Sequence, residues 1–266
     1  MDDGFFYDRA VQTANDVLTE ITYAYQTDLP NIRWRHFVSL LREKYSVTIE
    51  PHIFNDPNLN ARLAGIAMLG NHSLIQFNDS TMQSEERKHF TIVHEGVHVF
   101  RHKDDPDAEG EAFTDIIENS AYSPEEQVEE LITNQATSII MLNDSALLEC
   151  MKNNWGYGKI GGFYEMSASA LFERLVNYLY FNLQINPVTA RYLVGRYRCG
   201  DTAEARAFLP LLINHFDYIV DWFHDFPLTG NMLNELYLNL GIGIQAPASH
   251  WYQMRHIFPN QLNLIS

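Results

Sequence analysis

The sequence is poor in cysteine and has no long hydrophobic run. Its two cysteines, Cys150 and Cys199, lie in neither a CxxC motif nor a Cys/His cluster, which excludes a disulfide framework and favours a reducing cytoplasm. No stretch of about 18 or more apolar residues occurs, so a membrane span is not expected. The acidic N-terminus, MDDGFFYDRA, also differs from the basic start of a signal peptide. We therefore expect a cytoplasmic protein that makes no contact with a membrane.

Positive charge is scarce as well. The chain has 18 Lys and Arg against 34 Asp and Glu, a net charge of -16. Such a field repels phosphate backbones, so direct nucleic-acid binding is not expected. The one local basic cluster, formed by Arg191, Arg196, Arg198 and Arg206, is interpreted as solvated helix faces. With 266 residues, 46% of them hydrophobic, the chain can form one large or two small well-packed domains.

Hydrophobic spacing predicts a mixed α+β fold. Apolar residues recur every three or four positions over residues 8–26 and 34–45, which indicates two amphipathic helices. Three apolar or β-branched runs then predict short strands, and Gly70-Asn71 is a hairpin signal between the last two. These strands are expected over 46–54, 62–69 and 72–77. Helical spacing returns in most of the remaining chain, over 84–101, 124–142, 145–152, 167–182, 187–198, 202–216 and 231–240.

Two segments are predicted to lack regular structure. The acidic stretch Lys103–Ser123 does not have the glycine placement and ligand alternation of an EF-hand loop, and it is interpreted as a solvated loop. The glycine-rich segment Gly156–Gly162 is interpreted as a boundary. The predicted domains are therefore a core with N-terminal helices over 1–160 and a helical C-terminal region over 161–266, packed on that core.

One segment, FTIVHEGVH over residues 90–98, contains the motif HExxH. On a helix, residues four apart lie about 40° apart around the axis, so His94 and His98 project side by side. Two neutral imidazoles in this arrangement can bind one Zn²⁺. Glu95 lies beside them and can take a proton from a water molecule that attacks a carbonyl group. The motif predicts His94 and His98 as metal ligands and Glu95 as the general base.

A catalytic zinc normally has a third protein ligand and one open position. His102 is not expected to be that ligand, because one more turn of a straight helix carries it past the metal. The long metzincin motif bends the chain with a glycine where this sequence has Arg101. His102 is instead expected to lie at the helix end or to support a ligand. The third ligand should come from the start of the next predicted helix, which offers Glu125, Glu126, Glu129 and Glu130.

These segments resemble the ImmA/IrrE family of small zinc metallopeptidases. That family has an apolar strand ending in Asn, an FTxxHExxH helix with another His four residues on, and then a helix with Glu-x-x-Ala-Asn. The matching segments here are LIQFN (74–78), FTIVHEGVH (90–98) with His102, ELITN (130–134) and MSASAL (166–171) with Arg174-Leu175. The resemblance covers about residues 45–175. It selects Glu130 as the third ligand, because Asn134 follows four residues later, and Glu126 on the same helix face is the fallback.

The resemblance implies a zincin-like core with a small three-stranded sheet and an HExxH helix, followed by a mainly helical C-terminal part. It implies a Zn²⁺-dependent endopeptidase whose substrate is a regulatory protein, a helix-turn-helix repressor of a mobile element or of a stress response. The alternative is a non-catalytic zincin-fold module that holds a partner or senses metal, and the intact Glu95 favours the enzyme. Many relatives carry a DNA-binding domain at the N-terminus. Here the region before Tyr45 is short and acidic, so DNA recognition is expected of the partner.

Zincins often use a second hydrogen-bond donor to stabilise the tetrahedral oxyanion. Four residues are candidates, and the sequence does not choose among them: Tyr157, Tyr164, His89 and Arg174. For Arg174, an ion pair with the acidic stretch Lys103–Ser123 is an alternative role. Residues 182–266 carry no recognisable motif.

Overall fold

The computed structural model describes residues 3–54, 60, 62–105, 108, 110–116, 123–185, 187–200 and 203–214. The helix predicted over 231–240 lies outside these residues. The chain divides into two compact units. Unit 1 comprises Met1–Leu147 and Gly161–Arg174, and unit 2 comprises Leu148–Ile160 and Leu175–Ser266. The predicted domains, 1–160 and 161–266, stay a prediction.

Unit 1 begins with two α-helices, α1 (Asp3–Tyr25) and α2 (Trp34–Tyr45), joined through the 3₁₀ helix η1 (Leu29–Asn31). The buried side of α1 carries Ala10, Ala14, Val17, Leu18 and Ile21, spaced as the amphipathic pattern requires. Pro30 lies in the first turn of η1, where its missing N–H costs no helical hydrogen bond. Both helices were expected, although α1 starts five residues before the predicted Asp8.

The sheet of unit 1 has four strands in the order β1-β3-β2-β4. They are β1 (Thr48–His52), β2 (Leu63–Met68), β3 (Leu74–Asn78) and β4 (Ala112–Ile116). Strand β1 pairs in parallel with β3, whereas β2 pairs antiparallel with both β3 and β4. The three predicted strands are present, with the expected hairpin between β2 and β3. The fourth strand was not predicted.

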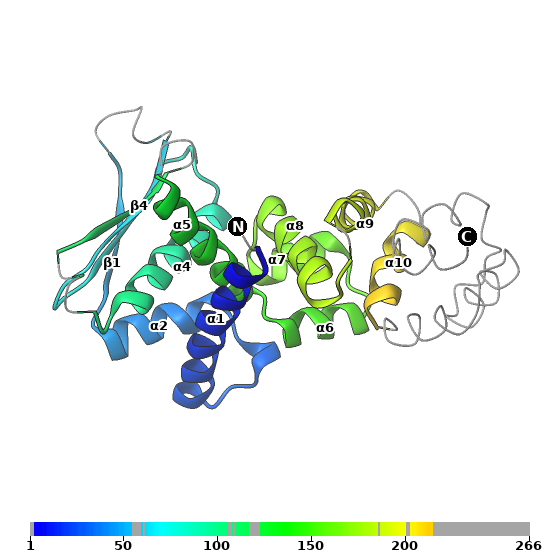
Figure 1. The fold of residues 1–266 in the computed structure, drawn as a ribbon, viewed down its shortest axis with the longest axis horizontal. Coiled ribbons are helices and arrows are strands. Elements are labelled where there is room, and N and C mark those ends of the chain that lie inside the picture. The colour runs from blue at the N-terminus through cyan, green and yellow to red at the C-terminus, as the bar shows by residue number, and fades with distance from the viewer. Residues whose placement is uncertain are drawn as a thin grey trace, which may run out of the picture. The chain divides into compact units, whose positions relative to one another are not determined.

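The two helices that carry the HExxH motif and its predicted partner are α4 (Glu85–His102) and α5 (Pro124–Met141). Helix α4 packs on β2, β3 and β4 and also on α2 and α5 (Figure 1). Its Phe90, Val93, Val97 and Phe100 are buried, as predicted. Helix α5 packs on both α1 and α4, so residues on two of its faces are buried. A capping box between Ser123 and Glu126 begins α5.

Strand β4 corrects the interpretation of Lys103–Ser123 as a solvated acidic loop. Asp115 in β4 is buried, and Arg87 of α4 donates hydrogen bonds to its two carboxylate oxygens at 3.2 and 3.1 Å. The Thr91 hydroxyl donates to the same carboxylate at 3.3 Å. Because these donors compensate the charge, an acidic residue can lie inside the sheet–helix interface.

The remaining helices are α6 (Asp144–Lys152), α7 (Tyr157–Tyr164), α8 (Ala168–Asn177), the π-helix η4 (Tyr178–Asn182), α9 (Pro187–Cys199) and α10 (Ala203–Asn214). Helix α7 was not predicted and runs through the glycine-rich segment that was interpreted as a boundary, and one of the unit boundaries, between Ile160 and Gly161, falls in that segment. The unit boundaries fall inside α6, α7 and α8. Among the described helices, none is long and apolar enough to cross a membrane.

Candidate metal centre

His94 and His98 lie one turn apart on α4, and both side chains are fully buried (0% exposed). Their Nε2 atoms are 3.2 Å apart, so the two rings converge on one point as the i, i+4 spacing predicts. Phe113 of β4 stacks on the His98 ring with centroids 4.5 Å apart. This contact restricts the orientation of the His98 ring.

Glu130 approaches the same point from α5. Its Oε2 lies 3.1 Å from His94 Nε2, and its Oε1 lies 3.2 Å from His98 Nε2. The side chain is buried at 8% exposure. Within the described part of the chain, His94, His98 and Glu130 form the group of His, Cys, Asp and Glu side chains that could hold a metal ion. The structure therefore brings together the three residues predicted as ligands, while their metal-binding role stays a prediction.

The two Nε2 atoms and the two carboxylate oxygens of Glu130, each of which approaches a different histidine, are spaced closely enough for a tetrahedral zinc site. Ligands about 2.0–2.1 Å from a tetrahedral zinc ion lie about 3.3–3.4 Å from one another. The observed separations of 3.1–3.2 Å are close to this value. Two imidazole nitrogens and one carboxylate oxygen are also a donor set typical of catalytic zinc. The residues present therefore fit a zinc ion with one position left open.

The electrostatics of the centre favour a cation. Burial lowers the pKa of His94, but the hydrogen bond to Glu130 and the charges of Asp115 and Glu95 raise it to about 9. Burial raises the pKa of Glu130, and its hydrogen bonds to His94 and His98 outweigh that effect and lower it to about 2. Without a metal, the cluster thus retains a proton between Glu130 and His94. A metal ion would take the place of that proton.

Glu95 is fully buried (0% exposed), next to His94 on α4. No side chain among the described residues hydrogen-bonds to either of its carboxylate oxygens. Burial raises its pKa well above the ordinary value for a glutamic acid. A carboxylate that is desolvated and uncommitted to another side chain is available to exchange a proton with a small molecule beside it.

Glu129 contacts the other side of His98. Its Oε1 lies 3.7 Å from His98 Nδ1 and 3.5 Å from His102 Nε2, and it forms an ion pair with Arg101. Burial raises the pKa of Glu129, whereas His102, His98 and Arg101 together lower it strongly. Metal-binding histidines usually donate their second ring N–H to a carboxylate or a carbonyl. Glu129 is placed to support His98, and His102 lies outside the cluster, as expected.

The other predicted glutamates are placed differently. Glu126, the fallback ligand, accepts a hydrogen bond from the backbone N–H of Ser123 at 2.7 Å and so caps α5. The side chain of Glu125 lies outside the described part of the structure. Among the glutamates offered by the sequence whose side chains the structure describes, Glu130 is the one that meets both histidine Nε2 atoms.

The four oxyanion candidates make other contacts. Arg174 is fully buried, donates to the carbonyl of Leu142 at 2.8 Å and forms an ion pair with Asp144. The remaining three have aromatic or main-chain neighbours: His89 stacks on Trp34, Tyr164 donates to the carbonyl of Pro30, and Tyr157 contacts the ring of Tyr197. The expected ion pair of Arg174 with Lys103–Ser123 stays a prediction, because much of that stretch lies outside the described residues.

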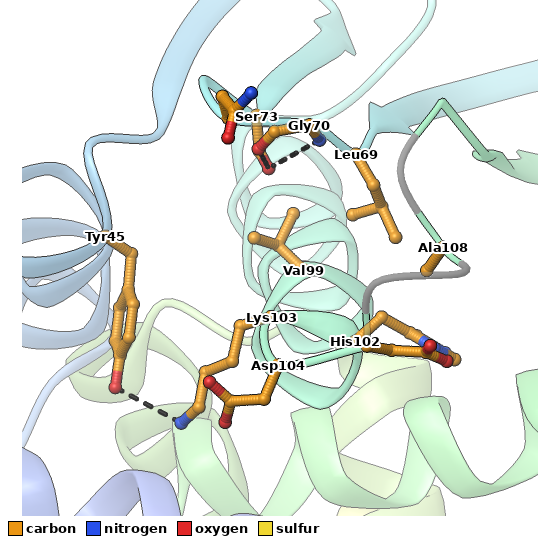
Figure 2. A pocket seen from close by; sticks show the side chains of 11 residues that line it. Tyr45, Leu69, Gly70, Ser73, Val99, His102, Lys103, Asp104 and Ala108 are labelled. Carbon is orange, nitrogen blue, oxygen red and sulfur yellow. Dashed lines mark hydrogen bonds between the residues drawn. The ribbon is translucent and has the colours of Figure 1, made fainter.

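A separate cavity of about 440 Å³ lies at the C-terminal end of α4. Figure 2 shows Val99, His102 and Lys103 of α4 lining it, with Tyr45 from the end of α2 on one side. Lys103 donates a hydrogen bond to the Tyr45 hydroxyl at 3.2 Å across this opening. His102 thus borders the cavity and also approaches Glu129, which in turn lies next to the predicted ligand His98.

Sequence reasoning did not find three residues around the centre: Phe113, Asp115 and Gly65. Phe113 and Asp115 are two residues apart on β4, so both point toward α4. The alternation of Phe113 and Asp115 on one side of the strand can be recognised in AFTDI, but the acidic residues around this segment suggested a solvated loop. Gly65 on β2 faces Thr91 and Glu95 of α4, and nothing in its local sequence indicates this.

Comparison with known families gives one match. Residues 63–176 match the model of a peptidase family described as the IrrE N-terminal-like domain. The match runs from the first residue of β2 into α8 and includes His94, Glu95, His98 and Glu130. It confirms the resemblance over these residues and indicates a metallopeptidase. No curated protein and no solved structure matches the chain.

Proposed function

We propose that the protein is a cytoplasmic zinc-dependent endopeptidase that hydrolyses a peptide bond in a regulatory protein. The observation that carries this proposal is the convergence of His94, His98 and Glu130 beside the buried Glu95. All four residues lie in the segment that matches a peptidase family.

The four side chains divide the work of hydrolysis. His94 and His98 would hold zinc through Nε2, and Glu130 through a carboxylate oxygen. When bound, zinc polarises a carbonyl group and acidifies a water molecule. Glu95 accepts a proton from the attacking water at its carboxylate and then delivers it to the nitrogen of the leaving amine. Water thus adds across the peptide bond as its C–N bond breaks.

The substrate class that we propose is a helix-turn-helix repressor of a mobile element or of a stress response. With a net charge of -16, this chain repels DNA itself. The same charge attracts the basic surface by which a repressor binds DNA, and it speeds their encounter. Cleavage of the repressor would release transcription.

One observation favours a second candidate, a non-catalytic module that holds a partner or senses metal. His94, Glu95 and His98 are all 0% exposed, so a substrate has no access to them in this conformation. A closed metal site would suit a binding or sensing role. The two candidates differ in whether the partner is cut or only bound.

The test uses a purified helix-turn-helix repressor as the candidate substrate. The zinc-loaded protein is incubated with the repressor, and intact-mass spectrometry follows both chains. We expect the repressor to be cut at one position. This cleavage should stop when a chelator removes the metal. An uncut repressor in a stable complex would support the binding module, and a repressor that is neither cut nor bound would contradict this choice of partner.

A further inference from the structure

We propose that Gly65 on strand β2 is a positioning residue for Glu95, because its missing side chain leaves the space that the general base occupies. The inference rests on the proposed function for the role of Glu95. It concerns the contact of α4 with strand β2, whereas Glu130 reaches the two histidines of α4 from α5. The three atoms nearest to a Cβ at residue 65 belong to Thr91 and Glu95.

The space beside Gly65 is too small for a methyl group. A Cβ atom at this position would lie 2.5 Å from Cγ2 of Thr91 and 2.8 Å from Oε1 of Glu95. It would also lie 3.1 Å from Cγ of Glu95. Ordinary contacts between carbon atoms are about 3.5–4.0 Å. Any side chain at residue 65 therefore forces Thr91, Glu95 or the strand itself to move.

A bulge in the sheet brings Gly65 to this place. Leu63 pairs with Ile116 and Gly65 pairs with Asp115, so β2 has one residue more than β4 between the two pairs. Such bulges bend a strand locally and re-aim its side chains, often beside active sites. Here the bulge places Gly65 directly next to Asp115. Gly65 and Asp115 then both face the side of α4 that carries Thr91.

Thr91 cannot move easily, because its hydroxyl is hydrogen-bonded to Asp115, the residue that pairs with Gly65 in the sheet. Arg87, Thr91 and Glu95 follow one another at four-residue steps along one face of α4. Asp115 accepts hydrogen bonds from Arg87 and from the Thr91 hydroxyl, while the Thr91 methyl points to Gly65. In contrast, no side chain among the described residues hydrogen-bonds to the carboxylate of Glu95, and the backbone of Asp115 is its hydrogen-bonding neighbour. A methyl group at residue 65 would therefore displace the end of Glu95 first.

The variant Gly65→Ala tests this directly, with fluorescein-labelled casein as the probe for hydrolysis. We expect the variant to bind zinc as the parent does, because the nearest atoms that the added methyl group would meet belong to Thr91 and Glu95, not to His94, His98 or Glu130. We expect kcat to fall by about 10²-fold at unchanged KM, as a displacement of about 1 Å can cause. Gly70→Ala is the matched control, since a methyl group there meets nothing within 4 Å.

A double variant, Gly65→Ala with Thr91→Ser, separates positioning from packing. Serine removes the methyl group that would be 2.5 Å away and keeps the hydroxyl that bonds Asp115. We expect the melting temperature to recover toward the parent value while kcat stays low. The proposal would be overturned if Gly65→Ala kept the parent rate. It would also be overturned if the double variant regained both stability and rate, since Gly65 would then act through packing alone.

A crystal structure of zinc-loaded Gly65→Ala gives a readout that does not depend on activity. We expect a displaced Glu95 carboxylate and unchanged His94, His98 and Glu130. An undisplaced Glu95 would overturn the proposal. If the zinc-loaded parent and Gly70→Ala both failed to cut casein and the repressor, the proposed function would be at fault, and the position of Glu95 in this crystal structure would still decide the role of Gly65.

Discussion

Glu129 and Glu130 are neighbours in the sequence, yet they meet different atoms of His98. Glu130 lies 3.2 Å from Nε2, and Glu129 lies 3.7 Å from Nδ1. About 100° separates adjacent residues around a helix, so the two carboxylates of α5 reach opposite sides of one imidazole ring. One is placed to bind a metal and the other to orient the ring.

We expect Glu130→Gln to weaken zinc binding by more than about 10²-fold, because it removes the charged ligand of the cluster. Titration of the purified variant against a competing chelator measures the affinity. Glu126→Gln is the control on the same helix and should bind as the parent does, since Glu126 caps α5. If Glu130→Gln bound zinc like the parent while Glu126→Gln or Glu129→Gln lost it, the family register that selects Glu130 would be wrong.

Replacing Glu129 should have a smaller effect on the same affinity. We expect Glu129→Ala to weaken zinc binding by about 10–100-fold, the usual cost of losing a residue that orients a ligand. Glu129→Gln should recover part of this loss, because its side-chain carbonyl oxygen can take the place of the carboxylate oxygen that faces His98 Nδ1 at 3.7 Å. A Glu129→Ala variant with an affinity within about threefold of the parent would show that Glu129 serves only the ion pair with Arg101.

The sequence predicts residues that act through local spacing much better than residues that meet across the fold. His94, Glu95 and His98 follow from the geometry of one helix turn. Glu130 was selected by the resemblance to a family, because helical periodicity alone does not decide between Glu129 and Glu130. Gly65 reaches Glu95 only through the pairing of β2 with β4 and the packing of α4 on both strands. No local pattern encodes such a contact.

At the level of elements, β4 shows how composition can mislead. The strand is only five residues long and lies in a stretch rich in Asp and Glu, a composition that is typical of a solvated loop. Its Asp115 is nevertheless buried against Arg87, a contact between residues 28 positions apart. Helix α7 was missed for a similar reason, because three glycines disfavour a helix when considered alone. In both cases tertiary contacts outweigh local preference.

This assignment of β4 predicts unequal costs for two similar substitutions. Asp115→Asn should lower the free energy of unfolding by about 1–3 kcal/mol, because it weakens charged hydrogen bonds in a buried contact. Asp104→Asn, an exposed position in the same acidic stretch, should change it by less than about 0.5 kcal/mol. Urea unfolding curves measure both. Equal, small effects would restore the interpretation of this stretch as a solvated loop.

For the whole molecule, every residue of the candidate centre belongs to unit 1. The centre ties α4 to α5 through His94, His98 and Glu130. A ligand that binds only the folded state stabilises it by about 4 kcal/mol at a free concentration of about 1,000 Kd. For a chain of this size, that corresponds to a rise in Tm on the order of 10 °C.

Zinc should therefore raise the Tm of the parent protein, and a chelator should reverse the change. Differential scanning calorimetry with and without zinc measures the shift. His94→Ala, which lacks one ligand, is the control and should melt at the same temperature in both conditions. A parent Tm that does not respond to zinc would mean that the three side chains pair with one another and hold no metal.

The central claim is that Glu95 performs proton transfer beside a zinc ion held by His94, His98 and Glu130. The most direct test compares Glu95→Gln with the parent, with zinc content and repressor cleavage measured on the same samples. We expect one zinc per chain in both proteins and cleavage slowed by about 10²–10⁴-fold in the variant, the usual cost of losing a general base. Cleavage at the parent rate by a zinc-loaded Glu95→Gln variant would contradict the claim and leave the metal a structural role.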